Sequence, residues 1–118
     1  MTKAQATKAR IIERAAALFN QQGYAGSSMS DLMRVTGLQK GGIYNHFGSK
    51  DELALAAFAF ATNRIQQQFI GALKNKRHAV DRLLAILRVY EHLLDDPPVP
   101  GGCPILNTAV ESDDTHPA

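Results

Sequence analysis

The fold of this chain is decided by residues 28–53, which read SMSDLMRVTGLQKGGIYNHFGSKDEL. Ser28 and Asp31 have the S-x-x-D spacing of a capping box, in which the hydroxyl accepts from the third backbone N–H of a helix and the carboxylate reaches back to the first residue. A helix is therefore predicted to open near Met29. Gly37 can take a positive φ, so it is expected to end this helix and turn the chain.

A second short helix is predicted over residues 40–47. Ile43 and Phe47 lie four residues apart and share one face, which leaves a polar, basic and aromatic edge around the rest of the helix. Ser49 and Glu52 repeat the capping-box spacing and predict a third helix with acids in its first turn, where the helix dipole favours them. Two short helices around a glycine turn, followed by a capped helix, are typical of a DNA-reading helix-turn-helix.

The charges of the chain support a nucleic-acid partner. Residues 1–50 contain seven basic and two acidic side chains, whereas residues 51–118 contain six basic and nine acidic ones. The net charge of +2 therefore hides a local excess of positive charge in the half that carries the turn motif. It is the local field that attracts a polyanion, although a charged run on its own is more often a solvated face.

Helices are also predicted on both sides of the motif. Residues 7–22 are expected to form one that ends at Gly23, with its apolar face on the motif, and residues 51–75 form a second that is buried on more than one side. Residues 79–94 have helical apolar periodicity. The face expected for the first of these helices consists of Ile12, Ala15, Ala16 and Phe19, and the stripe of the last consists of Val80, Leu83, Leu84, Leu87, Tyr90, Leu93 and Leu94.

The C-terminal part is predicted to contain a loop and one more helix. Residues 95–102 hold three prolines and two glycines, which sustain neither a helix nor a central strand. A short helix is expected to begin at residues 103–105 and to break at residues 112–114, and residues 115–118 look like the start of another helix. Its expected apolar face is Leu106, Ala109 and Val110. No strand pattern is present, so the sequence predicts an all-α protein.

Residues 9–53 resemble the N-terminal DNA-binding domain of the tetracycline-repressor (TetR) family of transcriptional regulators. The resemblance is carried by RIIERAAALF, QGY, SDL and TGLQKGGIYNHFGSKDEL, and the most specific part is I-Y-x-H-F-x-S-K-x-x-L after the glycine turn. It implies a helix-turn-helix domain over residues 1–50 and part of a helical ligand-binding and dimerisation domain over residues 51–118. Members of the family continue into two long helices that form the dimer interface, so this sequence is expected to be a fragment.

The resemblance also implies which residues meet operator DNA. The expected groove-facing residues are Gln39, Lys40, Gly41 and Asn45, and the expected phosphate contacts are Ser28, Tyr44, His46 and Lys50. Their chemistry agrees, because lysine donates to guanine and amides pair with adenine. Gly41 and Gly42 let the backbone approach DNA closely, although they could equally just loosen a surface turn. Gln39 replaces the small hydroxyl residue common in the family at this position, so it is expected to cap less well and to reach further.

A small hydrophobic effector is implied in the same way. Bound among the later helices, it would shift the helix that begins near Asp51 and change the spacing of two recognition helices in a homodimer. The expected pocket residues are apolar, and the same composition also suits plain packing. They are Phe58, Ala61, Ile65, Phe69, Leu84 and Leu87.

The remaining features exclude several classes of protein. The lone Cys103 precedes a proline at a predicted helix start, so it is either a redox or electrophile sensor or, more commonly, a small buried hydrophobe. The histidines lack partners at metal-ligand spacing, and no nucleophile, base and acid cluster as in an enzyme, so neither a metal nor another cofactor is expected. The N-terminus has no signal peptide and no apolar run could cross a membrane, which predicts a cytoplasmic protein.

The sequence therefore predicts a ligand-responsive transcriptional regulator, most simply a repressor that binds a palindromic operator as a dimer. The alternative is a helical protein-interaction or architectural module whose turn motif packs against another protein. Salt dependence separates the two, because contacts to phosphates weaken steeply with salt and apolar protein contacts do not.

Overall fold

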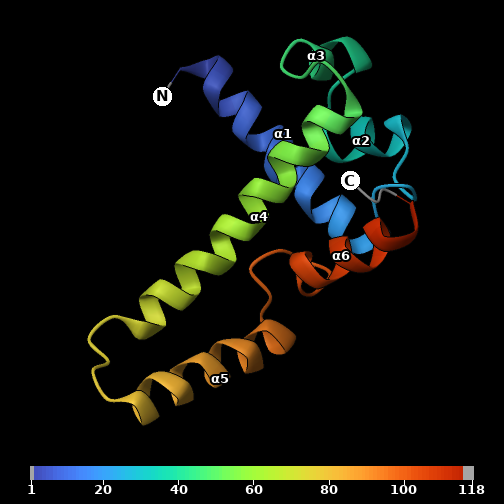
Figure 1. Ribbon diagram of the computed structural model, residues 1–118. Coiled ribbons are helices and arrows are strands. Elements are labelled where there is room, and N and C mark those ends of the chain that lie inside the picture. The colour runs from blue at the N-terminus through green and yellow to red at the C-terminus, as the bar shows by residue number, and fades with distance from the viewer. Residues whose placement is uncertain (1, 116–118) are drawn as a thin grey trace.

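Six helices follow one another in the computed structural model, which describes residues 2–115 (Figure 1). α1, α2 and α3 gather at one end of the molecule, and α4 runs from them to the far end, where the chain turns back into α5. α6 returns to the end of α1. The helices are α1 (Lys3–Gln22), α2 (Met29–Thr36), α3 (Lys40–Tyr44), α4 (Lys50–Leu73), α5 (Ala79–Asp95) and α6 (Pro104–Thr115). The described residues form no strand, and the all-α prediction is confirmed.

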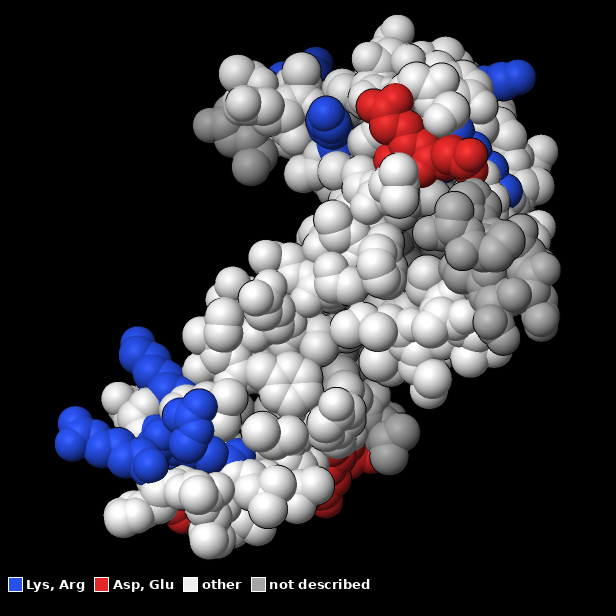
Figure 2. Space-filling model, in the orientation of Figure 1, with Lys and Arg blue, Asp and Glu red and all other residues white. Residues whose placement is uncertain are grey.

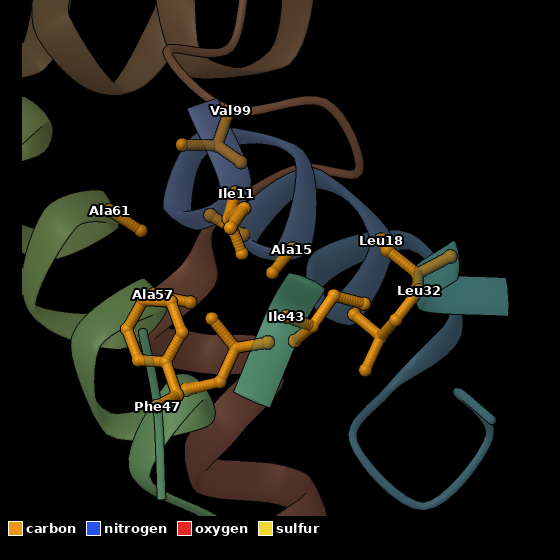
Figure 3. Packing of buried hydrophobic residues seen from close by; sticks show 11 residues of the cluster. Ile11, Ala15, Leu18, Leu32, Ile43, Phe47, Ala57, Ala61 and Val99 are labelled. Atoms are coloured by element: carbon orange, nitrogen blue, oxygen red, sulfur yellow. The ribbon is translucent and has the colours of Figure 1, made fainter. Parts of the chain in front are cut away.

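The hydrophobic core lies where α1 meets α2, α3 and the first half of α4 (Figure 3). α1 begins four residues earlier than expected, because Thr2 and Gln5 form a capping box. Its buried face is also turned from the predicted one, since α2 and α4 cover it from two sides and leave Ile12 and Phe19 only half-buried. The buried cluster consists of Ile11, Ala15, Ala16, Leu18, Leu32, Ile43, Phe47, Leu53, Ala57, Ala61 and Val99.

The local signals around the glycine turn are confirmed. Ser28 and Asp31 form both hydrogen bonds of the capping box, and Gly37 ends α2 with a φ of 72°. α3 is shorter than predicted and ends at Tyr44 instead of residue 47. The backbone N–H of His46 bonds to Ile43 only three residues back, because the chain tightens into a turn as it delivers Phe47 to the core.

Only one of the two hydrogen bonds of the predicted capping box forms at the start of α4. The Ser49 hydroxyl accepts from the backbone N–H of Glu52, as expected. The Glu52 carboxylate, however, accepts from the N–H of Gly48 at 2.6 Å rather than from that of Ser49. Glu52 thereby bonds one residue further back than in a capping box, and it still satisfies a backbone donor at the α3–α4 corner.

α5 buries only part of the apolar stripe from which it was predicted. It packs on α4, and its buried side chains are Ala85, Val89 and Leu93, of which Leu93 belongs to the predicted stripe. The ring of Tyr90 lies edge-on against Phe69 of α4 at a centroid distance of 5.5 Å. Four other residues of the predicted stripe are exposed, namely Val80, Leu83, Leu84 and Leu87.

α6 differs from the prediction in its length and in the side that it exposes to solvent. α6 begins at Pro104 as expected but continues through residues 112–114, where a break was predicted. This stretch contains no proline or glycine, and low helix propensity alone is a weak signal against a helix. The expected apolar face of α6 is also wrong, because Leu106, Ala109 and Val110 are exposed. The helix start expected at residues 115–118 lies largely outside the described residues.

Candidate nucleic-acid interface

The α2–α3 turn sets the direction in which α3 points. The buried Thr36 hydroxyl donates to the carbonyl of Leu32 at 2.7 Å, and its oxygen lies 3.3 Å from the backbone nitrogen of Leu38, from which it accepts. Gly37 stands between them in the left-handed conformation that glycine adopts at no steric cost. Ile43 then anchors α3 in the core with only 1% of its surface exposed. The opposite edge of α3 is therefore held toward solvent.

All eight predicted DNA-contact residues are accessible. Gln39, Lys40, Gly41, Tyr44 and Asn45 are exposed together on and beside α3. The Lys40 ammonium lies 5.8 Å from the centre of the Tyr44 ring, so a cation and an aromatic side chain share this edge. Gln39 precedes the helix without capping it through its side chain, as its length predicted. The predicted reading edge is thus confirmed as an exposed helical surface, whereas its contacts with DNA stay a prediction.

Charged and hydrogen-bonding residues of α1 and α2 lie on either side of this α3 surface. Ser28 is exposed, while its hydroxyl oxygen accepts from the N–H of Asp31. Asp31 accepts in return from Ser28, which lowers the pKa of its carboxyl through the backbone N–H first, then the hydroxyl, with a further contribution from Arg34 at 3.5 Å. Lys8 of α1, which sequence reasoning did not single out, lies 5.4 Å from the ring centre of Phe47. His46 is half-buried, and its ring centre lies 6.5 Å from that of Phe47.

Lys50 has an intramolecular partner that the sequence did not indicate. Its ammonium donates to the carbonyl of Tyr24 at 2.9 Å and lies 4.3 Å from the centre of the Tyr24 ring. The Tyr24 hydroxyl donates to the Asp51 carboxylate. This hydrogen bond, together with burial and the charge of Asp51, raises the pKa of Tyr24 to about 12. The start of α4 is thereby tied to the α1–α2 turn, and Lys50 keeps further N–H donors for a phosphate.

The Tyr24–Asp51 contact predicts a dependence of stability on alkaline pH. Because the pKa of Tyr24 rises from 10.0 in the unfolded chain to about 12 in the fold, its contribution is complete below pH 10 and is lost between about pH 10 and 12. The tyrosinate absorbance of wild type minus that of Tyr24→Phe should show a titration near pH 12. Chemical denaturation should show that the free energy of unfolding of the variant lacks the decrease that wild type shows between about pH 10 and 12. A Tyr24 that titrates near pH 10 would contradict the contact.

Basic side chains also gather far from the turn motif. Figure 2 shows a cluster at the end of the molecule where α4 connects to α5. This distal basic cluster consists of Lys74, Lys76, Arg77 and Arg82. The positive charge of the chain is therefore divided between two ends, which the count over each half of the sequence concealed.

The predicted effector residues do not surround the hollow that the structure describes between α4 and α5. That hollow has a volume of about 440 Å³ and is lined by Gln67, Gln68, Gly71, Ala72, Val89, His92 and Asp96. Ala61 and Ile65 are buried, Phe69 packs on Tyr90, and Phe58, Leu84 and Leu87 are exposed. The lining of an effector pocket by these six residues stays a prediction.

The other chemical candidates are placed as follows. Cys103 is a half-buried free thiol immediately before α6, and its sensing role stays a prediction. Among the side chains that the structure describes, no three from histidine, cysteine or acidic residues come together as metal ligands. None of the helices in the described part of the chain has the length and apolar character needed to span a bilayer.

Comparison with known proteins identifies relatives of both parts of the chain. Residues 11–57 match the family described as bacterial regulatory proteins, tetR family, and residues 79–118 match the tetracyclin repressor-like C-terminal domain. A TetR transcriptional regulator from Chloroflexus aurantiacus J-10-FL has a similar crystal structure, with a TM-score of 0.93, 53% identity, and coverage of 99% of this chain and 59% of that one.

Curated relatives agree with these matches. The HTH-type transcriptional regulator YezE of Bacillus subtilis is 26% identical over 103 residues, which are 87% of this chain and 53% of that protein. The regulator TtgR of Pseudomonas putida is 41% identical over 54 residues, 46% of this chain and 26% of that protein. The chain therefore spans about half or less of the length of these curated relatives.

Proposed function

Because residues 11–57 and 79–118 of this chain belong to the TetR family of bacterial regulatory proteins, we propose that it is part of a ligand-responsive repressor that binds a palindromic operator as a dimer. The observation that carries this proposal is the α3 edge, where Gln39, Lys40, Gly41, Tyr44 and Asn45 are exposed together over buried Ile43. On this proposal the protein is cytoplasmic and acts by binding DNA and effector rather than by catalysis.

In the proposed complex, α3 enters the major groove. Lys40 and Asn45 donate to base edges, Gln39 reaches a neighbouring base, and Gly41 lets the backbone come close. Ser28, Tyr44, His46 and Lys50 contact phosphates on either side and set the register of the helix on the duplex. Two such helices in a dimer read half-sites about 34–36 Å apart.

We propose that residues 1–50 bind DNA and that residues 51–118 contribute to effector binding and dimerisation. α4 is the physical connection, because Leu53, Ala57 and Ala61 of its first half lie in the same buried cluster as Ile43 of α3, while α4 also packs on α5. A small hydrophobic effector that moved the second half of α4 would therefore reorient α3. Such a shift changes the spacing of the two reading helices and weakens many contacts together.

The salt dependence of DNA binding tests this function. In the complete gene product, DNA binding should weaken steeply with salt, because cations of the protein contact phosphates. Lys40→Ala should weaken binding to a duplex selected from a random pool by about 5- to 100-fold, because the contact of a cation with a base edge is lost. Fluorescence anisotropy at several salt concentrations measures both quantities.

Lys76→Ala is the matched control, since it removes the same charge from the distal basic cluster. We expect its affinity and salt slope to equal those of wild type. A protein that selects no duplex, or one in which both variants change alike, would contradict the proposed interface. It would favour a module whose turn motif packs against another protein.

A further inference from the structure

α6 and the loop before it are attached directly to the end of α1. The side-chain amide of Asn20, in the last turn of α1, is shared among the carbonyls of Val99, Pro100 and Gly102 at 3.3, 2.8 and 3.0 Å. The loop residue Val99 is also buried in the core, with 2% of its surface exposed. Segments about 80 residues apart in the chain are thus held together by polar and apolar contacts at once.

Asn107 of α6 extends this attachment. Its side-chain amide donates to the Asn20 side-chain oxygen at 2.8 Å and to the carbonyl of Gly101 at 2.9 Å. Asn20 therefore accepts from α6 while it donates to the loop. A Cβ on Gly101 would lie 2.7 Å from the Asn20 carbonyl oxygen, so the close passage of the two chains depends on this glycine.

Glu111 makes the most consequential contact, because it reaches the turn that leads into α2. One carboxylate oxygen accepts from the backbone N–H of Tyr24 at 2.7 Å and the other from that of Ala25 at 3.2 Å. Glu111 lies four residues after Asn107, so both side chains leave the same face of α6. Charge-assisted bonds of this bidentate kind define direction as well as energy.

The same turn is held by α4 from the opposite side of the peptide chain. The Tyr24 carbonyl accepts from Lys50, and the Tyr24 hydroxyl donates to Asp51. One residue thus presents its N–H to α6 and its carbonyl and side chain to α4. Ser28, which caps α2, follows only four residues later.

We propose that Asn107 and Glu111 are positioning residues that hold the α1–α2 turn, and with it the helix-turn-helix, at a set orientation to the regulatory helices. α6 then affects the orientation of the helix-turn-helix through the hydrogen bonds of Asn107 and Glu111, in addition to any effect transmitted by α4. This inference rests on the proposed function for its consequence in DNA binding, whereas the contact itself is independent of that function.

Hydrogen exchange and DNA binding of the complete gene product test the proposal together. Glu111→Ala should speed amide exchange of Tyr24 and Ala25 roughly tenfold or more, because their acceptor is removed. Protection of Leu32 and Ile43 in the core should persist. Affinity for the selected duplex should fall about three- to tenfold, since a loosely held helix-turn-helix must be ordered on binding.

Three further variants make the test specific. Val110→Ala alters the exposed neighbour of Glu111 on the same helix and should match wild type in both measurements. Asn107→Ala should reproduce the loss of affinity. Glu111→Gln retains one acceptor oxygen and should give intermediate exchange and affinity, which also covers the case in which Glu111→Ala does not fold.

Each contrary result has a distinct meaning. Unchanged exchange at Tyr24 and Ala25 would overturn the contact, and faster exchange with unchanged affinity would overturn the positioning role. If wild type selects no duplex, the proposed function fails, and the exchange rates in Glu111→Ala and Glu111→Gln still decide whether α6 holds the turn.

Discussion

Leu32→Ala is expected to lower the free energy of unfolding by about 2–5 kcal/mol, the range for a leucine removed from a close-packed core. Leu32 has no exposed surface and lies in the cluster where α2 meets α1 and α3 (Figure 3). Its loss opens a void beneath the helix-turn-helix and takes away the support of Ile43. Denaturant titration followed by circular dichroism measures the change.

Leu55→Ala is the matched control for that substitution. Leu55 lies on α4 near the same core, yet 72% of its surface is exposed. The same change of side chain should therefore cost no more than about 0.5 kcal/mol. Equal losses in the two variants would mean that α2 is not packed as the structure has it.

Gly41→Glu should reduce affinity for the selected duplex about 100-fold or more while leaving the fold intact. Gly41 is exposed, and a Cβ built on it meets no atom within 4 Å, so the protein itself accommodates the new side chain. On the proposed complex, the carboxylate would face the phosphates and bases that α3 approaches, and such juxtaposition of like charges costs several kcal/mol. Anisotropy titration measures the affinity, and thermal denaturation checks that stability is retained.

Gly71→Glu provides the same substitution at a second exposed helical glycine with no atom within 4 Å of its added Cβ. Because Gly71 lies in the far half of α4, its affinity should stay within about twofold of wild type, as expected for a single surface charge beyond the screening length. Similar binding by both variants would favour the alternative in which Gly41 and Gly42 only loosen a surface turn.

The confirmed predictions around residues 28–44 depend on interactions within a few residues. The Ser28–Asp31 box joins groups three positions apart, and Gly37 ends α2 through its own backbone freedom. The exposed edge of α3 follows from Ile43, whose burial sends Lys40, Gly41 and Tyr44 to the other side. Short-range spacing therefore sufficed to predict both the motif and its reading edge.

Several of the wrong predictions concern the neighbours of a helix. The apolar stripe of α5 is periodic in sequence, but only packing on α4 determines that Ala85 and Val89, rather than Leu83 and Leu87, face inward. α3 ends earlier than predicted for a comparable reason, since Phe47 enters the core from a turn and not from the helix. Periodicity identifies a helix without identifying what covers it.

Local sequence determined the helix-turn-helix, its caps and the class of fold, because capping, glycine conformation and helical spacing act over four residues or fewer. Only the tertiary structure decided how that unit is held. The bonds from Asn107 to Asn20 and from Glu111 to Tyr24 join residues 87 positions apart, and no local pattern marks such partners. They exist because the Val99 loop folds back on the core and sets α6 beside the end of α1.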